Sequence, residues 1–133
     1  AVLGNEDPIA SVPGEVTPNH EFYSYEAKYL DEEGAGFQIP AKLSDSLVKQ
    51  VQKLAIRSFH TLYCEGMARV DFFLTADDQF IMNEINTIPG FTRISMYPKL
   101  FEASGIPYAD LIDRLVKLAI ARHERQQGLK TSR

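Results

Sequence analysis

The sequence predicts an α+β fold, in which helices pack on one face of an antiparallel β-sheet. Two segments of strand character, residues 67–74 and 80–85, flank a short polar turn and predict a tight hairpin. One long amphipathic helix is predicted before this hairpin and two helices after it. Because the strongest strand pair is a hairpin, an antiparallel sheet is favoured over a parallel one.

The N-terminal segment predicts strand ends and loops. Residues 1–4 have strand character, and turn-forming residues follow at 5–8. The aromatic segment over residues 15–29 has no clean period and predicts an ordered loop with a short strand or helical turn. Residues 31–36 predict a polar, mobile loop. The apolar opening AVLGN, without a methionine, predicts a piece of a larger protein.

Three helices are predicted from capping residues and apolar spacing. Ser44 suits the N-cap of the first helix, and Gly66 lies just past its expected end. Ser95 is expected to cap a short helix over about 97–103, and the last helix spans about 108–125. The apolar face of the first helix consists of Leu47, Val51, Leu54, Ala55, Phe59 and Leu62.

The hairpin places charged and amide side chains at matched positions. Residues two apart in a strand share a face, so Arg69 lies beside Asp71, and Glu84 beside Asn86. With the turn centred on the DD pair, Asp71 is opposite Glu84 and Arg69 is opposite Asn86. Two opposed carboxylates repel each other, so a bound cation would stabilise them. Oxygen ligands of this kind suit Mg²⁺.

The alternative is that these charges simply face water, as on the open side of many antiparallel sheets. Three features argue against it. The opposed residues are both acids, the strand ends in NTIPGFT with a glycine flanked by backbone amides, and the expected companions on this face are apolar: Phe73, Phe80 and Met82. Arg69 is expected either to neutralise the acids or to reach a phosphate or oxyanion.

The composition limits the classes of partner that this protein is expected to bind. The 133 residues correspond to one domain, with 44% hydrophobic and 24% charged residues, as in ordinary globular proteins. The net charge of −4 argues against nucleic-acid or membrane-surface binding, because both favour basic patches. A single cysteine, Cys64, excludes an internal disulfide.

A series of motifs along the whole chain resembles one known family. In order, the segments are AVLGN, PGEV, FYSYEAKY, IPA, RVDFF, NEINTIPGFT, SMYP and SGIPYADLI. They resemble the C-terminal region of the D-alanine–D-alanine ligases, which belong to the ATP-grasp superfamily. The resemblance implies that residues 1–133 are an ATP-grasp C-terminal subdomain of a larger ligase, with a mobile lid loop at about 15–36 and a metal-binding hairpin at about 67–86.

The resemblance also implies an activity for the intact enzyme. It would join two D-alanines into D-alanyl-D-alanine through an acyl phosphate, cleave ATP to ADP and phosphate, and serve peptidoglycan synthesis in the cytoplasm. The full-length enzyme is expected to be a homodimer that uses D-alanine and ATP and binds neither nucleic acid nor membrane. The first domain, the adenine contacts and the first-D-alanine contacts are expected to lie outside this chain, so this fragment alone is expected to be inactive.

Metal and phosphate roles follow from the resemblance for the hairpin residues. Asp71, Glu84 and Asn86 would bind two Mg²⁺ ions that hold the ATP phosphates, with Mn²⁺ as a substitute. Glu84 would bridge the two ions. Arg69 would stabilise the transferring phosphate and the tetrahedral intermediate, and Asn83 would belong to the nucleotide-binding set.

The resemblance also implies substrate-binding roles for residues in the loops. The Gly90 N–H would bind the oxyanion, and Ser95 with the backbone of Met96 would hold the carboxylate of the second D-alanine. Lys28 and Tyr29 would lie on the lid, with the lysine near the γ-phosphate.

Two alternatives remain. The first is another ATP-grasp ligase, including one that makes D-alanyl-D-lactate. Relatives of that kind tend to carry a histidine where this chain has EAKY, so Lys28 and Tyr29 favour the dipeptide. The second is a non-catalytic nucleotide-binding module, which the intact set of hairpin residues argues against.

Overall fold

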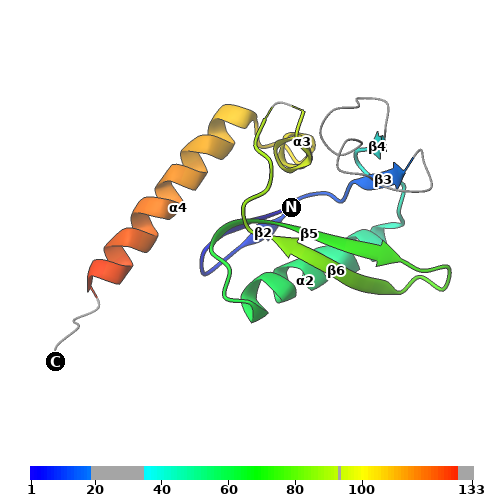
Figure 1. The fold of residues 1–133 in the computed structure, drawn as a ribbon, viewed down its shortest axis with the longest axis horizontal. Coiled ribbons are helices and arrows are strands. Elements are labelled where there is room, and N and C mark those ends of the chain that lie inside the picture. The colour runs from blue at the N-terminus through cyan, green and yellow to red at the C-terminus, as the bar shows by residue number, and fades with distance from the viewer. Residues whose placement is uncertain (19–34, 93, 129–133) are drawn as a thin grey trace.

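A computed structural model describes residues 1–18, 35–92 and 94–128 (Figure 1). The predicted Lys28 and Tyr29 lie outside these residues. The elements are β1 Val2–Gly4, β2 Ile9–Ala10, β3 Glu15–Pro18, β4 Ala35–Gln38, α2 Asp45–Thr61, β5 Gly66–Leu74, β6 Phe80–Asn86, α3 Met96–Ala103 and α4 Tyr108–Gly128. The predicted α+β class is confirmed. No helix within the described ranges is long and apolar enough to span a membrane.

The main sheet has four strands in the order β2-β1-β5-β6, and each neighbouring pair is antiparallel. The β5–β6 hairpin is therefore joined to the rest of the molecule through β1. Residues 5–8 connect β1 to β2 as the predicted turn. β5 pairs with β1 through residues 66–68 and with β6 through residues 69–74, so it connects the hairpin to the rest of the sheet.

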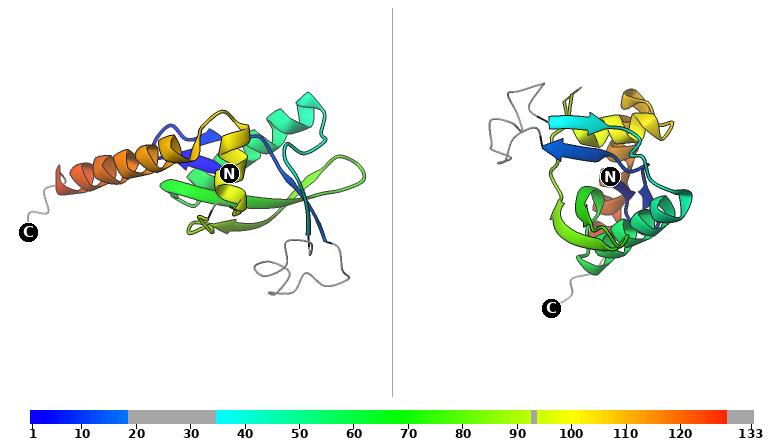
Figure 2. Two further views of the ribbon diagram at one scale, coloured as in Figure 1. Left: turned by 90° about the horizontal axis from the view of Figure 1, so that it is seen from above. Right: turned by 90° about the vertical axis from the view of Figure 1, so that its right-hand side faces the viewer.

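A separate two-stranded ribbon is formed by β3 and β4. The sequence predicted mostly loop here, and the pairing of residues 15–18 with 35–38 is a correction. Strands of four residues that are far apart in sequence carry too little periodicity to reveal their pairing. The ribbon lies beside α3 (Figures 1 and 2). Gly14, just before β3, approaches α3 so closely that an added Cβ would lie 2.9 Å from side-chain atoms of Leu100 and Met96.

Helices cover both faces of the main sheet, whereas the sequence predicted one covered face. Ala55 and Phe59 of α2 pack with Val2 and Ala68 on one side. On the other side, the residues packed together are Leu3, Tyr97, Phe101, Ile106 and Leu111. Neighbouring residues of β1 point to opposite faces, so this short strand contributes to both cores. The prediction failed because an amphipathic helix reveals its own apolar face but not which side of a sheet it covers.

The helix ends agree with the predictions in part. Ser44 caps α2 as expected, and its side chain accepts a hydrogen bond from the backbone N–H of Leu47. The chain reverses after α2 through Tyr63, which has a φ of 52°, and not through Gly66, which already begins β5. Ser95 occupies the N-cap position of α3, but its side chain makes no capping hydrogen bond.

Tyr97 connects α3 to the sheet. Its side chain is only 1% exposed, and its hydroxyl donates a 3.0 Å hydrogen bond to the backbone oxygen of Val2. Its ring packs against Phe101 at a centroid distance of 5.1 Å. Burial raises the pKa of the Tyr97 hydroxyl, so the group remains a protonated donor across the physiological range.

We expect Tyr97→Phe to lower the free energy of unfolding by about 1–3 kcal/mol, because a buried acceptor loses its donor. Urea denaturation of the wild-type and variant proteins measures the difference. Tyr63→Phe is the matched control: the Tyr63 side chain is 92% exposed, so this change should stay within about 0.5 kcal/mol. Equal effects of the two substitutions would contradict a structural role for the buried hydroxyl.

Candidate functional site

The hairpin has the predicted register at its functional end. Arg69 pairs with Asn86, and Asp71 pairs with Glu84. The turn that sets this register is stabilised by a 2.6 Å hydrogen bond from the Thr75 hydroxyl to the carboxylate of Asp77. That bond lowers the pKa of the Asp77 carboxyl, because it stabilises the charged form. Two acids are thus placed opposite each other by backbone pairing.

A β-bulge interrupts the hairpin directly beyond the acid pair. The register shifts between Asp71 and Phe72, so that Phe72 pairs with Met82 and Asn83 is the extra residue. A shift of one residue turns the following side chains of β6 to the other face. The proposed role of Asn83 in nucleotide binding remains a prediction.

The bulge changes which side chains share a face of the hairpin with Asp71 and Glu84 (the acid face), so the predicted composition of that face was partly wrong. Phe80 and Met82 do not share that face, because Met82 pairs with Phe72, which packs toward α2. The Phe72 and Phe80 rings are in edge contact with centroids 6.1 Å apart. Phe73 remains on the acid face as predicted, and Ile81 lies opposite it. The error arose because a bulge leaves no periodic signal in so short a strand.

Arg69 neutralises the acid pair in this structure. Its Nε and Nη2 atoms donate to the two Asp71 carboxylate oxygens at 2.9 and 2.8 Å, and Nη2 also donates to Glu84 Oε1 at 3.2 Å. The side chains of Arg69, Asp71 and Glu84 are 27%, 34% and 48% exposed. The acids are therefore accessible from outside, and solvent screens the pairs enough that each contributes little to stability.

The oxygen atoms at this end of the hairpin fit a divalent cation. Asp71 and Glu84 supply carboxylates, and Asn86 lies on the same face. The Asn86 Oδ1 atom accepts a 3.0 Å hydrogen bond from the backbone N–H of Ile88 and keeps a second lone pair. The residues that the structure describes contain no cluster of three or more His, Cys, Asp or Glu side chains that could hold a metal, so the candidate site consists of two carboxylates and one amide oxygen. Such ligands are typical of Mg²⁺, which binds one or two carboxylates and completes its shell with water and phosphate.

The glycine loop after β6 is anchored by Phe91, a residue that the sequence analysis did not single out. Its ring packs against Tyr97 and Tyr108 with centroid distances of 5.9 and 5.4 Å. The Tyr108 hydroxyl donates a hydrogen bond to the Phe91 backbone oxygen at 3.3 Å. An aromatic residue next to a loop glycine was the only available signal, and it does not reveal these partners.

The loop brings Gly90 and Ser95 close together, and their predicted roles in substrate binding remain predictions. A Cβ added to Gly90 would lie 3.1 Å from Ser95 Oγ, closer than an ordinary contact. The absence of a side chain at Gly90 therefore gives the serine hydroxyl its space.

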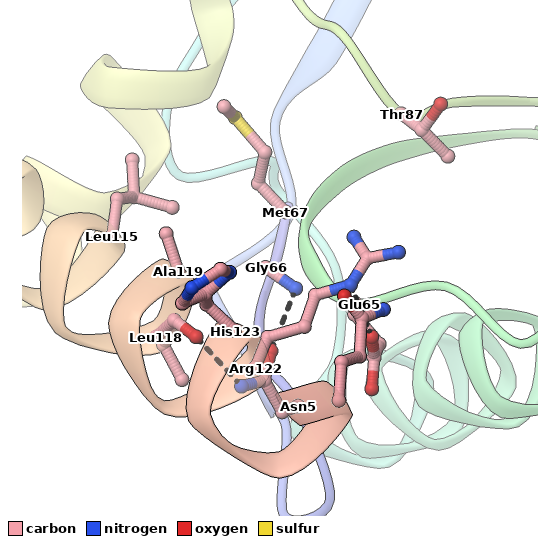
Figure 3. Close-up of a pocket in the computed structure, with 11 residues that line it drawn as sticks. Asn5, Glu65, Gly66, Met67, Thr87, Leu115, Leu118, Ala119, Arg122 and His123 are labelled. Atoms are coloured by element: carbon pink, nitrogen blue, oxygen red, sulfur yellow. Dashed lines mark hydrogen bonds and ion pairs between the residues drawn. The ribbon is translucent and has the colours of Figure 1, made fainter. Parts of the chain in front are cut away.

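A cavity of about 300 Å³ lies elsewhere, between α4 and the start of β5 (Figure 3). Glu65 on its wall forms ion pairs with Arg122, at 2.7 Å, and with Arg125. Asn5 accepts a hydrogen bond from the Gly66 N–H at 3.1 Å and donates one to the Leu118 backbone oxygen at 3.0 Å. These contacts hold α4 against the first residue of β5, so we assign the cavity a structural role.

We expect Arg69→Gln to lower the free energy of unfolding by about 1 kcal/mol, because the opposed carboxylates lose a neutralising cation. Millimolar Mg²⁺ should recover much of that loss if the acid pair binds it. Urea denaturation with and without Mg²⁺ measures both effects. In the control, Arg69→Gln combined with Glu84→Gln, Mg²⁺ should have no effect. An equal response of both variants to Mg²⁺ would argue against a cation site between the acids.

The fold and the hairpin together define an α+β subdomain of the ATP-grasp class, in which two opposed carboxylates and an arginine share one face of a β-hairpin. The family model "D-ala D-ala ligase C-terminus" matches residues 1–117. The chain therefore belongs to the family of D-alanine–D-alanine ligase C-terminal domains.

Individual relatives agree with this assignment. The chain is 61% identical over 133 residues to a D-alanine–D-alanine ligase of Oceanobacillus iheyensis, covering 100% of this chain and 36% of that protein. It is 57% identical over 129 residues to one from Coxiella burnetii, covering 97% of this chain and 35% of the relative. The chain thus spans about a third of the length of these relatives.

Solved structures show the same fold. The D-alanine–D-alanine ligase from Coxiella burnetii superposes with a TM-score of 0.81 at 48% identity, covering 96% of this chain and 32% of that one. The VanG D-Ala:D-Ser ligase from Enterococcus faecalis superposes with a TM-score of 0.77 at 32% identity, covering 88% and 34%. The predicted family and fold are both confirmed.

Proposed function

We propose that this chain is the C-terminal part of an ATP-dependent, ADP-forming ligase that joins two D-alanines. The observation that carries the proposal is the pairing of Asp71 with Glu84 beside Arg69, within a fold shared with ligases of this name. The product, D-alanyl-D-alanine, serves peptidoglycan synthesis. The enzyme is proposed to be cytoplasmic and homodimeric, and to use two Mg²⁺ ions that Mn²⁺ can replace.

The chemistry of such a ligase has two steps. The carboxylate of the first D-alanine attacks the γ-phosphorus of ATP, which forms an acyl phosphate and releases ADP. The amine of the second D-alanine then attacks the acyl carbon, loses a proton, and expels phosphate as the amide bond forms. The first step concentrates negative charge on phosphate oxygens, and the second concentrates it on the acyl oxygen.

The hairpin residues act on the phosphate end of this reaction. Asp71, Glu84 and Asn86 are proposed to hold the Mg²⁺ ions, which supply positive charge to the phosphates. Arg69 already lies between the two acids, so its guanidinium is positioned to turn from Asp71 toward a transferring phosphate. Neutralisation of the acids in the free protein and stabilisation of phosphate in the complex are thus successive roles of one side chain.

Gly90 and Ser95 act on the substrate end. The Gly90 N–H is proposed to donate to the developing oxyanion, and the Ser95 hydroxyl, with the backbone of Met96, to bind the carboxylate of the second D-alanine. The close approach of the Ser95 hydroxyl to Gly90 supports a shared substrate region. The lid at about 15–36, with Lys28 near the γ-phosphate and Tyr29 beside it, is proposed from the resemblance alone.

Next to the acids, Phe73 and Ile81 form an exposed apolar pair on the same face. Exposed apolar side chains beside a phosphate site suit the flat ring of a nucleoside. We propose that this pair contributes to nucleotide binding together with residues on other parts of the full-length chain. The sequence analysis had instead placed the adenine contacts outside this chain.

We expect Glu84→Gln in the full-length ligase to lower kcat at least about a hundredfold, because a metal-binding charge is lost from the transition state. Coupled ADP-release kinetics at saturating ATP and D-alanine measure the change. Glu124→Gln, on the exposed surface of α4, is the control and should leave kcat unaltered. Wild-type kcat in Glu84→Gln would refute the metal role.

The VanG neighbour is a D-Ala:D-Ser ligase, which gives one specific reason to test other acceptors. Phosphate release by the full-length protein should be fastest with D-alanine alone and slower with D-alanine plus D-serine or D-lactate. Malachite-green detection of phosphate across a panel of amino acids measures this preference. Robust turnover without D-alanine, or none with it, would overturn the dipeptide assignment.

A further inference from the structure

Thr92 and Ser95 form a compact hydrogen-bonded unit in the glycine loop. The backbone N–H of Thr92 donates to Ser95 Oγ at 3.0 Å, and the backbone N–H of Ser95 donates to the Thr92 carbonyl at 3.0 Å. The two hydroxyl oxygens are 2.8 Å apart, so one of them donates to the other. No role was predicted for Thr92 from the sequence.

The direction of the hydroxyl–hydroxyl bond decides what Ser95 can offer a ligand. A serine hydroxyl has one proton to donate and two lone pairs that accept. The Thr92 N–H already fills one lone pair of Ser95 Oγ. If the Thr92 hydroxyl donates as well, both lone pairs are filled and the Ser95 proton is free to point outward. If Ser95 donates instead, its proton is used and it presents a lone pair.

A carboxylate distinguishes these two states. Its oxygens only accept hydrogen bonds, so it binds a serine that presents a proton and is repelled by one that presents a lone pair. We propose that Thr92 is a positioning residue, whose hydroxyl donates to Ser95 and thereby directs the Ser95 proton toward the carboxylate of the second D-alanine. This inference rests on the proposed function of Ser95.

The capping geometry of α3 supports this proposal independently. A serine at the N-cap position ordinarily accepts a hydrogen bond from a backbone N–H in the first turn, which stabilises the helix. Ser95 is at that position, but its side chain makes no such bond. Its hydroxyl is held by Thr92 instead, in the space left by Gly90. A local stabilising interaction is absent where a substrate contact is proposed, as is common at functional sites.

The test compares two substitutions in the full-length ligase. Thr92→Val keeps the β-branched shape and the backbone N–H but removes the hydroxyl, and Thr92→Ser restores the hydroxyl without the methyl group. We expect Thr92→Val to raise the KM for the acceptor D-alanine about five- to tenfold, as for one lost hydrogen bond in binding, with kcat within about twofold of wild type. Thr92→Ser should have a KM close to that of wild type.

Thr61→Val is the matched control. The Thr61 hydroxyl donates a 2.8 Å hydrogen bond to the Arg57 backbone oxygen at the end of α2, outside the glycine loop. This variant should change neither kinetic constant. The KM for ATP should also be unchanged in Thr92→Val, because the proposed effect is confined to the carboxylate of the acceptor. Melting temperatures of all variants report any general loss of structure.

The outcomes separate the proposals. An unchanged acceptor KM in Thr92→Val would overturn the positioning role of Thr92 while leaving the ligase function intact. Equal loss of kcat in Thr92→Val and Thr92→Ser, with lowered melting temperatures, would also overturn it, because the hydroxyl would then not be the relevant group. A wild-type ligase that does not consume D-alanine would refute the proposed function and the inference together.

Discussion

The candidate site depends above all on the pairing of Asp71 with Glu84 across the β5–β6 hairpin. Two like charges at directly opposed positions of a sheet disfavour that register. The register nevertheless holds, because strand pairs on either side of the acids, Val70 with Ile85 and Phe72 with Met82, and the hydrogen-bonded turn support it. Arg69 offsets the repulsion in the free protein. A sheet that maintains two acids in this arrangement provides a prepared site for positive charge.

The two cores explain how the site stays rigid while its acids remain accessible. α2 covers one face of the sheet, and α3 with α4 covers the Met67 end of the other. The acids lie further along β5, beyond the packed region. The same α3 core holds the ring of Phe91 and so positions the glycine loop. Phosphate-end and substrate-end groups are therefore placed by one packed framework, and preorganisation of this kind reduces the reorganisation that a reaction requires.

Three departures from local structural preference lie around this site. The acid pair opposes like charges, β6 contains a bulge directly beyond it, and Ser95 at the N-cap of α3 makes no side-chain capping bond. Away from the site, Ser44 caps α2 as expected, while Tyr63 at the end of that helix adopts a left-handed φ of 52°. Natural proteins tolerate such departures mainly where a function requires them. The three departures at the site agree with the chemistry proposed for it.

The sequence alone determined the helices, the hairpin, the register of Asp71 against Glu84 and the family, because periodicity, capping residues and motif order are local properties of the chain. Only the tertiary structure decided which sheet face each helix covers, the β3–β4 pairing, and the bulge that moves Phe80 and Met82 away from the acid face. It also decided that the Ser95 hydroxyl is bound by Thr92. These features depend on contacts between segments distant in sequence or on a single inserted residue, and neither leaves a periodic pattern that a sequence can display.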